Sequence, residues 1–319
     1  MDSENNCRLV SSRGILKSCD IHSATPISSI KELVNYNWDA LRPGSTVYVC
    51  SSALGQVAQS LDRLPHPIIL VSGDADEDVP FQIFSSNVDF QTFIESPKII
   101  HWFAQNGVIR HPKFSQIPIG LDYHTMSAVL NIYGPQCSPL EQERALQQIL
   151  QRASMLINRS HKTYSNFHSL PTVVSREEMR IANPHLSFNS SVLSGNDRSL
   201  AIEHVPASIV ERELRRVDRK TTWENQAQYA FVISPHGYGL DCHRTWEALC
   251  LGCIPIVRTS PLDGLFEGLP VYIVQDWSDV TEANLKKVLA DFSQRTFDLN
   301  RLTLSYWMNK INAKKALVV

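Results

Sequence analysis

The sequence lacks an excess of either charge and any hydrophobic run long enough to cross a membrane. Its 30 lysine and arginine residues nearly balance 32 aspartate and glutamate residues, which gives a net charge of −2. Without a basic surplus, a chain has no general electrostatic attraction to nucleic acid or to an anionic membrane surface. The first residues, MDSENNCRLVSSRG, lack the apolar core of a signal peptide. We therefore expect a soluble, cytoplasmic protein that binds neither nucleic acid nor membranes.

The sequence also lacks a regular pattern of cysteines. The seven cysteines are odd in number and scattered along the chain, which predicts a reducing compartment without disulfides. Cys242, Cys250 and Cys253 leave a zinc site open as an alternative. Because Cys250 and Cys253 stand within apolar runs, burial as small hydrophobic residues is the favoured interpretation.

The length of 319 residues suits two domains, which we place at residues 1–150 and 151–319 with a hinge near Gln147–Arg152. Short apolar runs alternate with helical stretches in both halves, a pattern typical of parallel sheets covered on both faces. The predicted fold is therefore α/β, with two doubly wound Rossmann-like domains facing a cleft. The predicted strands are Thr46–Cys50, Ile68–Val71, Lys98–Phe103, Gln116–Ile119, Met155–Asn158, Tyr229–Ile233, Ile254–Val257 and Val271–Val274. The predicted helices are Ile27–Trp38, Ala53–Leu61, Ser138–Ala153, Glu177–Ala182, Cys242–Leu251 and Glu282–Asn312.

The most informative segment runs from Phe231 to Trp277. A buried strand ends in a loop with Gly237 and Gly239, and Asp241 is the predicted N-cap of the helix that follows. Free backbone N–H groups at a helix N-terminus attract anions such as a diphosphate. Arg244 and Glu247 share one face of this helix, where a guanidinium can pair with phosphate and a carboxylate can accept from ribose hydroxyls. The pattern favours a nucleotide-sugar site.

Within this segment, CHRTWEALCLGCIPIV resembles the signature of exostosin-like glycosyltransferases. The likeness is strongest over Ser234–Val257, and His243-Arg244 stands where the family has a basic pair. It implies a GT-B architecture, a UDP-sugar donor, inverting transfer to a carbohydrate acceptor and a C-terminal helix that crosses back to the first domain. The loop at Ser72 and the run Ile117–Asp122 are similar to compact virus-encoded relatives, some of which transfer xylose. These relatives imply a xylosyl donor and, for a viral protein, the host-cell cytoplasm.

The resemblance and the loop chemistry together give the expected donor site. Glu247 is expected on the ribose, and Arg244 with the Gly237–Gly239 loop on the diphosphate. Tyr238 is a candidate for stacking on uracil. The other candidate donor contacts are Ser234, His236, His243, Asn158, Arg159 and, more weakly, Arg176.

The first half supplies candidates for catalysis. Ser72-Gly73-Asp74-Ala75-Asp76-Glu77-Asp78 follows a predicted strand, and a carboxylate there can take the proton of an acceptor hydroxyl. Asp74 is the first candidate because Gly73 permits a sharp turn, and Asp76 is the second. A solvated acidic turn is the alternative. Asp122 with His124 forms another candidate base or sugar contact, although Asp122 could instead cap a helix. The candidate acceptor contacts are Ser51, Ser52, Gln105 and Asn106.

Asp74-Ala75-Asp76 is an Asp-x-Asp motif, which suggests binding of Mg²⁺ or Mn²⁺, but it lies in the half of the chain opposite the proposed diphosphate loop. We therefore expect no metal and no cofactor. Two other functions remain open from the sequence. One is a sugar-nucleotide epimerase or hydrolase on the same fold, and the other is a non-catalytic glycan- or nucleotide-binding module.

Overall fold

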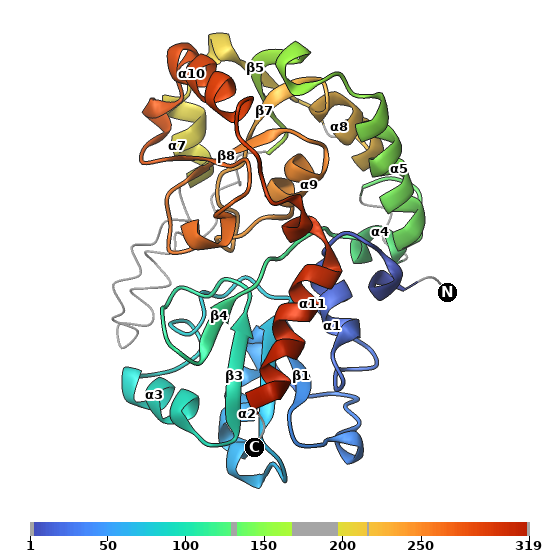
Figure 1. Ribbon diagram of the computed structural model, residues 1–319, viewed down its shortest axis with the longest axis vertical. Helices are drawn as coiled ribbons and strands as arrows, with labels where there is room; N and C mark the ends of the chain where they lie inside the picture. Colours follow the sequence, from blue (N-terminus) through green and yellow to red (C-terminus); the bar gives the residue numbers. More distant parts are fainter. Residues whose placement is uncertain (1–2, 129–132, 168–196, 216, 318–319) are drawn as a thin grey trace.

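The computed structural model describes residues 3–128, 133–167, 197–215 and 217–317, and it forms two α/β lobes (Figure 1). The first lobe holds a parallel sheet in the order β1-β2-β3-β4. Its two leading strands are buried at every position, because helices and loops cover both faces. The strands are β1 (Ser45–Cys50), β2 (Ile68–Gly73), β3 (Ile99–Ala104) and β4 (Phe114–Gln116).

The second lobe holds another parallel sheet, in the order β6-β5-β7-β8-β9. The chain moves outward from β5 to β6 and then returns to place β7 on the other side of β5. This reversal makes a switch point between β5 and β7, where ligands of doubly wound sheets bind at the carboxyl ends of the strands. The strands are β5 (Ser160–Ser165), β6 (Val210–Arg212), β7 (Tyr229–Ile233), β8 (Ile254–Arg258) and β9 (Tyr272–Val274).

Helices connect and cover the strands, and local capping fixes several of their ends. Ser138 and Glu141 form a reciprocal capping box at the start of the longest helix in the described residues, α5. The helices are α1 (Ser12–Ser18), α2 (Leu54–Ser60), α3 (Asn87–Glu95), α4 (His124–Ser127), α5 (Pro139–Arg152), α7 (Asp197–His204), α8 (Arg219–Gln226), α9 (His243–Cys250), α10 (Glu282–Phe292) and α11 (Leu304–Asn312). None of them combines the length and apolarity needed to cross a membrane.

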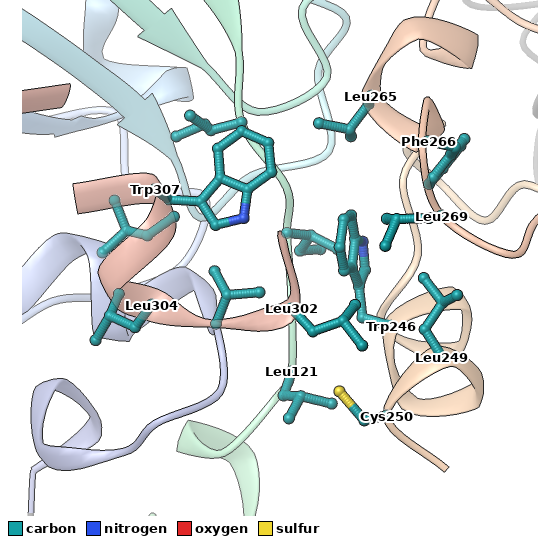
Figure 2. Packing of buried hydrophobic residues seen from close by; sticks show 14 of the residues in the cluster. Leu121, Trp246, Leu249, Cys250, Leu265, Phe266, Leu269, Leu302, Leu304 and Trp307 are labelled. Atoms are coloured by element: carbon teal, nitrogen blue, oxygen red, sulfur yellow. The ribbon is translucent and has the colours of Figure 1, made fainter. Parts of the chain in front are cut away.

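The last helix, α11, leaves the second lobe and packs beside α1 against the first lobe (Figure 1). A hydrophobic cluster at this junction joins α9, the 262–269 loop and α11, with Trp246 and Trp307 among its largest members (Figure 2). Leu121 adds a side chain from the segment after β4. One continuous core therefore ties the two lobes together behind the cleft.

The predicted α/β fold with two parallel sheets is confirmed. Three local predictions are wrong. Ile27–Trp38 contains turns and bends but no α-helix, and Met155–Asn158 is no strand, because 156–158 form a single 3₁₀ turn before β5. The predicted strand Gln116–Ile119 overlaps β4 only at Gln116, where β4 ends. The predicted C-terminal helix is interrupted at residues 293–303. The predicted helix Glu177–Ala182 lies outside the described residues.

Candidate functional site

A cleft of about 610 Å³ lies between the lobes, at the carboxyl edge of both sheets. The first lobe contributes residues that follow β2 and β4. The second lobe contributes residues from the switch point, from the loop after β7 and from helices α7, α8 and α9. The side chains used below are Asp76, Asp122, Asn166, Phe167, Arg198, Arg219, Tyr238, Asp241, His243, Arg244 and Glu247.

The glycine loop after β7 is compact because of what it touches. Gly237 N–H donates to the carbonyl of Gly239 at 3.0 Å. A Cβ at position 239 would lie 2.7 Å from Asn106 Nδ2 and 3.1 Å from the carbonyl oxygen of Asp76. Both contacts belong to the first lobe. Glycine is therefore favoured here because the Asn106 side chain and the Asp76 backbone of the first lobe leave little room for a Cβ.

Two guanidinium groups line the cleft beside this loop. Arg244, in the first turn of α9, donates from Nε to Asn166 Oδ1 at 2.9 Å and lies 5.5 Å from the centre of the Phe167 ring. Arg198 Nη2 would be 3.2 Å from a Cβ at Gly237. Burial, together with the neighbouring charge of Arg198, lowers the pKa of Arg244. Two like charges next to a helix N-terminus make this part of the cleft favourable for an anion.

A buried charge network closes another side of the cleft. Arg219 on α8 donates from Nη2 to Asp122 Oδ2 at 2.8 Å, and its Nε lies 3.7 Å from Glu247 Oε1. Burial alone would raise the pKa of Asp122, but His243, His124 and Arg219 hold it well below its ordinary value. Asp122 Oδ1 also accepts from Thr125 N–H at 3.0 Å. Asp122 is therefore an ionised anchor that joins α4 to α8.

Asp241 joins the lobes next to the glycine loop. Its N–H donates to Asn106 Oδ1 at 2.9 Å, and its Oδ2 accepts from Ile119 N–H at 2.7 Å. Trp246 Nε1 donates to its Oδ1 at 2.8 Å. The expectation that Asp241 caps the helix is wrong, because Cys242 occupies the N-cap position. Burial raises the pKa of Asp241 to about 6.

Two histidines flank Asp122. His243 Nδ1 lies 2.7 Å from the carbonyl oxygen of Gly120, so this nitrogen carries the proton and donates across the lobes. His124 Nδ1 lies 3.1 Å from Asp122 Oδ1, outside hydrogen-bonding geometry. Burial lowers the pKa of His124 against the opposing effect of Asp122. His243 lines the cleft, whereas His124 stands behind Asp122.

The structure separates the two candidate carboxylates after β2. Asp74 is buried, accepts from Ser28 Oγ at 2.8 Å and lies 3.5 Å from Arg13 Nη2. The sharp turn is made by Asp74 itself, which has φ of 55°, and not by Gly73. Asp76 is exposed and lines the cleft. Asp76 is therefore the carboxylate of this loop with direct access to a ligand.

Other predicted site residues lie outside the cleft lining. Asn158 and Arg159 precede β5, so they stand at the amino end of the sheet and not, as expected, after a strand. Arg159 donates there to the carbonyl of Leu251 at 2.9 Å, beside a separate pocket of about 400 Å³. Ser234 shares a 2.8 Å hydrogen bond with Thr245, and His236 N–H donates to Asp197 at 2.8 Å. Both of these residues are buried behind the glycine loop.

Of the candidate acceptor residues, two make side-chain hydrogen bonds to neighbouring loops and two are buried at the edge of the first sheet. Ser52 Oγ donates to Glu77 Oε1 at 2.6 Å, and Asn106, with φ of 51°, holds the glycine loop of the other lobe. Ser51 and Gln105 are buried at the carboxyl edge of the first sheet. Arg176 lies outside the described residues. Among those residues, no group of three His, Cys, Asp or Glu side chains is placed to hold a metal.

Sequence reasoning missed Arg198, Arg219, Asn166 and Phe167, all of which line the cleft. Asn166 and Phe167 follow β5 directly, so a correct position for that strand would have identified them. Arg219 lies in the charged run ERELRRVDRK, which has the composition of a solvated helix surface. Nothing in the sequence of this run distinguishes Arg219, which is buried between two carboxylates, from the other arginines.

A scan against protein-family models and a search of curated proteins both find no match. Solved structures similar to the chain include an alpha,alpha-trehalose-6-phosphate synthase from Burkholderia multivorans, with 14% identity, 88% of this chain and 73% of that chain covered, and a TM-score of 0.36. Another is a UDP-forming alpha,alpha-trehalose-phosphate synthase from Burkholderia vietnamiensis, with 13% identity, 88% and 71% covered, and a TM-score of 0.32. Likenesses this distant identify neither a family nor an activity, so the function is argued from the cleft itself.

Proposed function

We propose that the protein is a glycosyltransferase that moves a sugar from a UDP-sugar to a carbohydrate acceptor across the inter-lobe cleft. The observation that carries the proposal is that Arg198 and Arg244 both line the cleft beside the glycine loop and the N-terminus of α9. A diphosphate would neutralise both guanidiniums and accept from the helix N-terminus. The exostosin-like motif spans the same loop and helix.

The remaining donor contacts follow from this position. Glu247 lies one helical turn beyond Arg244 and is oriented by Arg219 at 3.7 Å, which suits it to accept from two ribose hydroxyls. Tyr238 lines the cleft with 51% of its surface exposed and offers a ring for the uracil base. Xylose is the donated sugar that the resemblance to the compact relatives favours.

In the proposed reaction, Asp76 acts as the general base. It takes the proton of an acceptor hydroxyl while that oxygen forms a bond to the anomeric carbon on the face opposite UDP. The bond between the anomeric carbon and the diphosphate oxygen breaks, and the configuration inverts. Arg198, Arg244 and the α9 N-terminus stabilise the charge that develops on the leaving diphosphate.

Because these groups already supply positive charge at the leaving group, we propose that transfer proceeds without a metal ion. The test is to measure turnover before and after treatment with EDTA, and then with added Mg²⁺ or Mn²⁺. Equal rates under the three conditions are expected. A rate that falls with EDTA and returns with Mn²⁺ would show that this part of the proposal is wrong.

The proposed function is tested by incubating the protein with a panel of UDP-sugars, with and without mixed monosaccharide acceptors, and analysing UDP and sugar products by mass spectrometry. A transferase releases UDP and forms a glycoside only when an acceptor is present. Release of free sugar without acceptor would indicate a hydrolase, and a changed sugar still attached to UDP would indicate an epimerase. UDP binding without turnover of any donor would indicate a binding module.

A further inference from the structure

The N-terminal segment, which the sequence shows only as polar and irregular, reaches the carboxyl edge of the first sheet. Helix α1 places Arg13 Nη2 3.5 Å from Asp74 Oδ2 and 3.2 Å from Ser28 Oγ. Ser28 in turn donates to Asp74 Oδ1 at 2.8 Å. Three segments that are distant in sequence therefore meet at one polar cluster after β2.

Around this cluster, several buried polar atoms lack a hydrogen-bond partner. They are Nε of Arg13, Oγ of Ser51 and Nε2 of Gln105. Ser51 and Gln105 are almost completely buried, at 1% and 2% exposure. Gln105 is held in place because its Oε1 accepts from the N–H of Asp74 at 3.1 Å. Buried polar groups are rarely left unpaired, so this arrangement points to a ligand that completes them.

The chemistry of the cluster selects the ligand. The guanidinium and the amide donate hydrogen bonds, Asp74 accepts them, and the serine hydroxyl can do either. Neighbouring hydroxyl groups of a sugar need donors and acceptors side by side, because each hydroxyl donates one hydrogen bond and accepts another. The charges of both Arg13 and Asp74 influence the pKa of His124. His124 also lies beside Asp122, which lines the cleft, so it connects the cluster to the cleft.

We propose that Arg13, Ser51, Asp74 and Gln105 form the recognition site for a neutral, hydroxyl-rich acceptor sugar, and not for a sugar phosphate or a sugar acid. The proposal rests on the proposed transferase function and names the class of its acceptor. Asp74 acts here as a binding residue, which is consistent with Asp76 being the base.

The charges in and beside the cluster favour a neutral acceptor over an anionic one. Asp74 already balances the positive charge of Arg13. The same loop then carries Asp76, Glu77 and Asp78, so an acceptor with its own negative charge would approach three further carboxylates. A neutral sugar meets no such repulsion and can still use every donor and acceptor in the cluster.

The test measures binding by saturation-transfer NMR titration in the presence of saturating UDP. The neutral probes are the methyl pyranosides of glucose, galactose, mannose and xylose, and the acidic probes are methyl glucuronide and glucose 6-phosphate. We expect at least one neutral probe to bind, and its acidic counterpart to bind at least about tenfold more weakly. Equal or tighter binding of the acidic probes overturns the proposal, as does a panel in which no neutral probe binds.

Variants locate the site. Arg13→Gln and Ser51→Ala should each weaken binding of the neutral probe by about fivefold and leave UDP affinity unchanged. Lys17→Gln, on the same helix but paired with Glu4, is the matched control and should bind the probe normally. Asp74→Asn leaves Arg13 unbalanced, so the ratio of glucuronide to glucoside affinity should rise. A purely structural role would not change that ratio, and an unchanged ratio overturns the proposal.

Failure of this inference differs from failure of the proposed function. Loss of UDP binding in the wild-type protein would contradict the transferase function itself. Normal UDP binding with a preference for acidic acceptors would contradict only the acceptor class.

Discussion

Replacement of Arg244 by alanine tests the proposed diphosphate site most directly. Two of the five N–H donors of its guanidinium are used by Asn166 Oδ1 at 2.9 Å and, over a longer 3.4 Å, by the carbonyl of Pro235. The remaining donors can serve an anion. A charge-assisted hydrogen bond contributes about 1.5–3 kcal/mol. Arg244→Ala should therefore weaken UDP binding by about 10- to 150-fold.

Comparison of UDP with uridine isolates the phosphate contribution. Both ligands are titrated into wild-type and variant protein in a calorimeter. Because uridine carries no phosphate, its affinity should change by less than about twofold in Arg244→Ala. Arg244→Lys should give an intermediate loss for UDP, since an ammonium supplies charge without the planar fork. Arg295→Ala is a matched control, because Arg295 follows the C-terminus of α10 and forms an exposed ion pair with Asp291 of that helix.

Two results would refute the reasoning. An equal loss of affinity for uridine and UDP would mean that Arg244 shapes the pocket without binding phosphate. An unchanged UDP affinity in a folded variant would mean that the diphosphate lies elsewhere. Melting temperatures measured without ligand show whether the variant is folded. With ligand, the wild type should gain more stability from UDP than the variant, in proportion to the logarithm of the affinity ratio.

Three further predictions follow from the same cleft. Asp76→Asn should lower the transfer rate by about 10²- to 10⁴-fold and leave UDP affinity intact in calorimetry, and normal turnover would exclude Asp76 as the base. Gly239→Ala should lower the free energy of unfolding, measured by denaturant titration, by about 1–3 kcal/mol, because its Cβ would meet Asn106 and Asp76. Gly55→Ala in α2, which has open space around it, should raise the free energy of unfolding by up to about 1 kcal/mol. For Asp241, a pKa raised to about 6 means that the folded protein keeps a proton that the unfolded chain has already released. The contribution of this one carboxyl to stability is therefore greatest below about pH 4 and is lost as the pH rises through about 6. Asp241→Asn should remove about 2–3 kcal/mol of that loss between pH 4 and 7, and an unchanged slope in urea titrations would contradict the burial argument.

Strands β1, β2, β3, β7, β8 and β9 were predictable from sequence, because apolar runs such as Ile68–Val71 indicate burial on both faces of a sheet. Strand β6 was not predicted, and β4 was displaced toward the C-terminus. Helix α9 was predictable because a glycine loop precedes it and Gly252, with φ of 69°, follows it. Strand β5 was misplaced because three of its six residues are exposed, so it has no continuous apolar run. That error moved the expected phosphate contacts to Asn158 and Arg159, at the wrong end of the sheet.

The site was less predictable than the fold because sequence patterns do not show which charges are paired. Asp74 and Asp76 look equivalent in a run of carboxylates, but an arginine 61 residues earlier engages only Asp74. Arg219 could not be distinguished from its charged neighbours until Asp122 and Glu247 were placed around it. Such pairings are long-range, and neither helical periodicity nor loop composition encodes them.

In the proposed transferase, the glycine loop after β7 would connect donor binding to the position of the first lobe. On one side it lies against Arg198 and leads into α9, and on the other it contacts Asn106 and Asp76. Asp241 extends this contact through hydrogen bonds to Asn106 and Ile119. If a diphosphate orders this loop, the same event fixes Asp76 relative to the donor, because its backbone carbonyl touches Gly239. Donor binding and placement of the base are then one structural step, so Gly239→Ala should reduce turnover by more than it reduces UDP affinity.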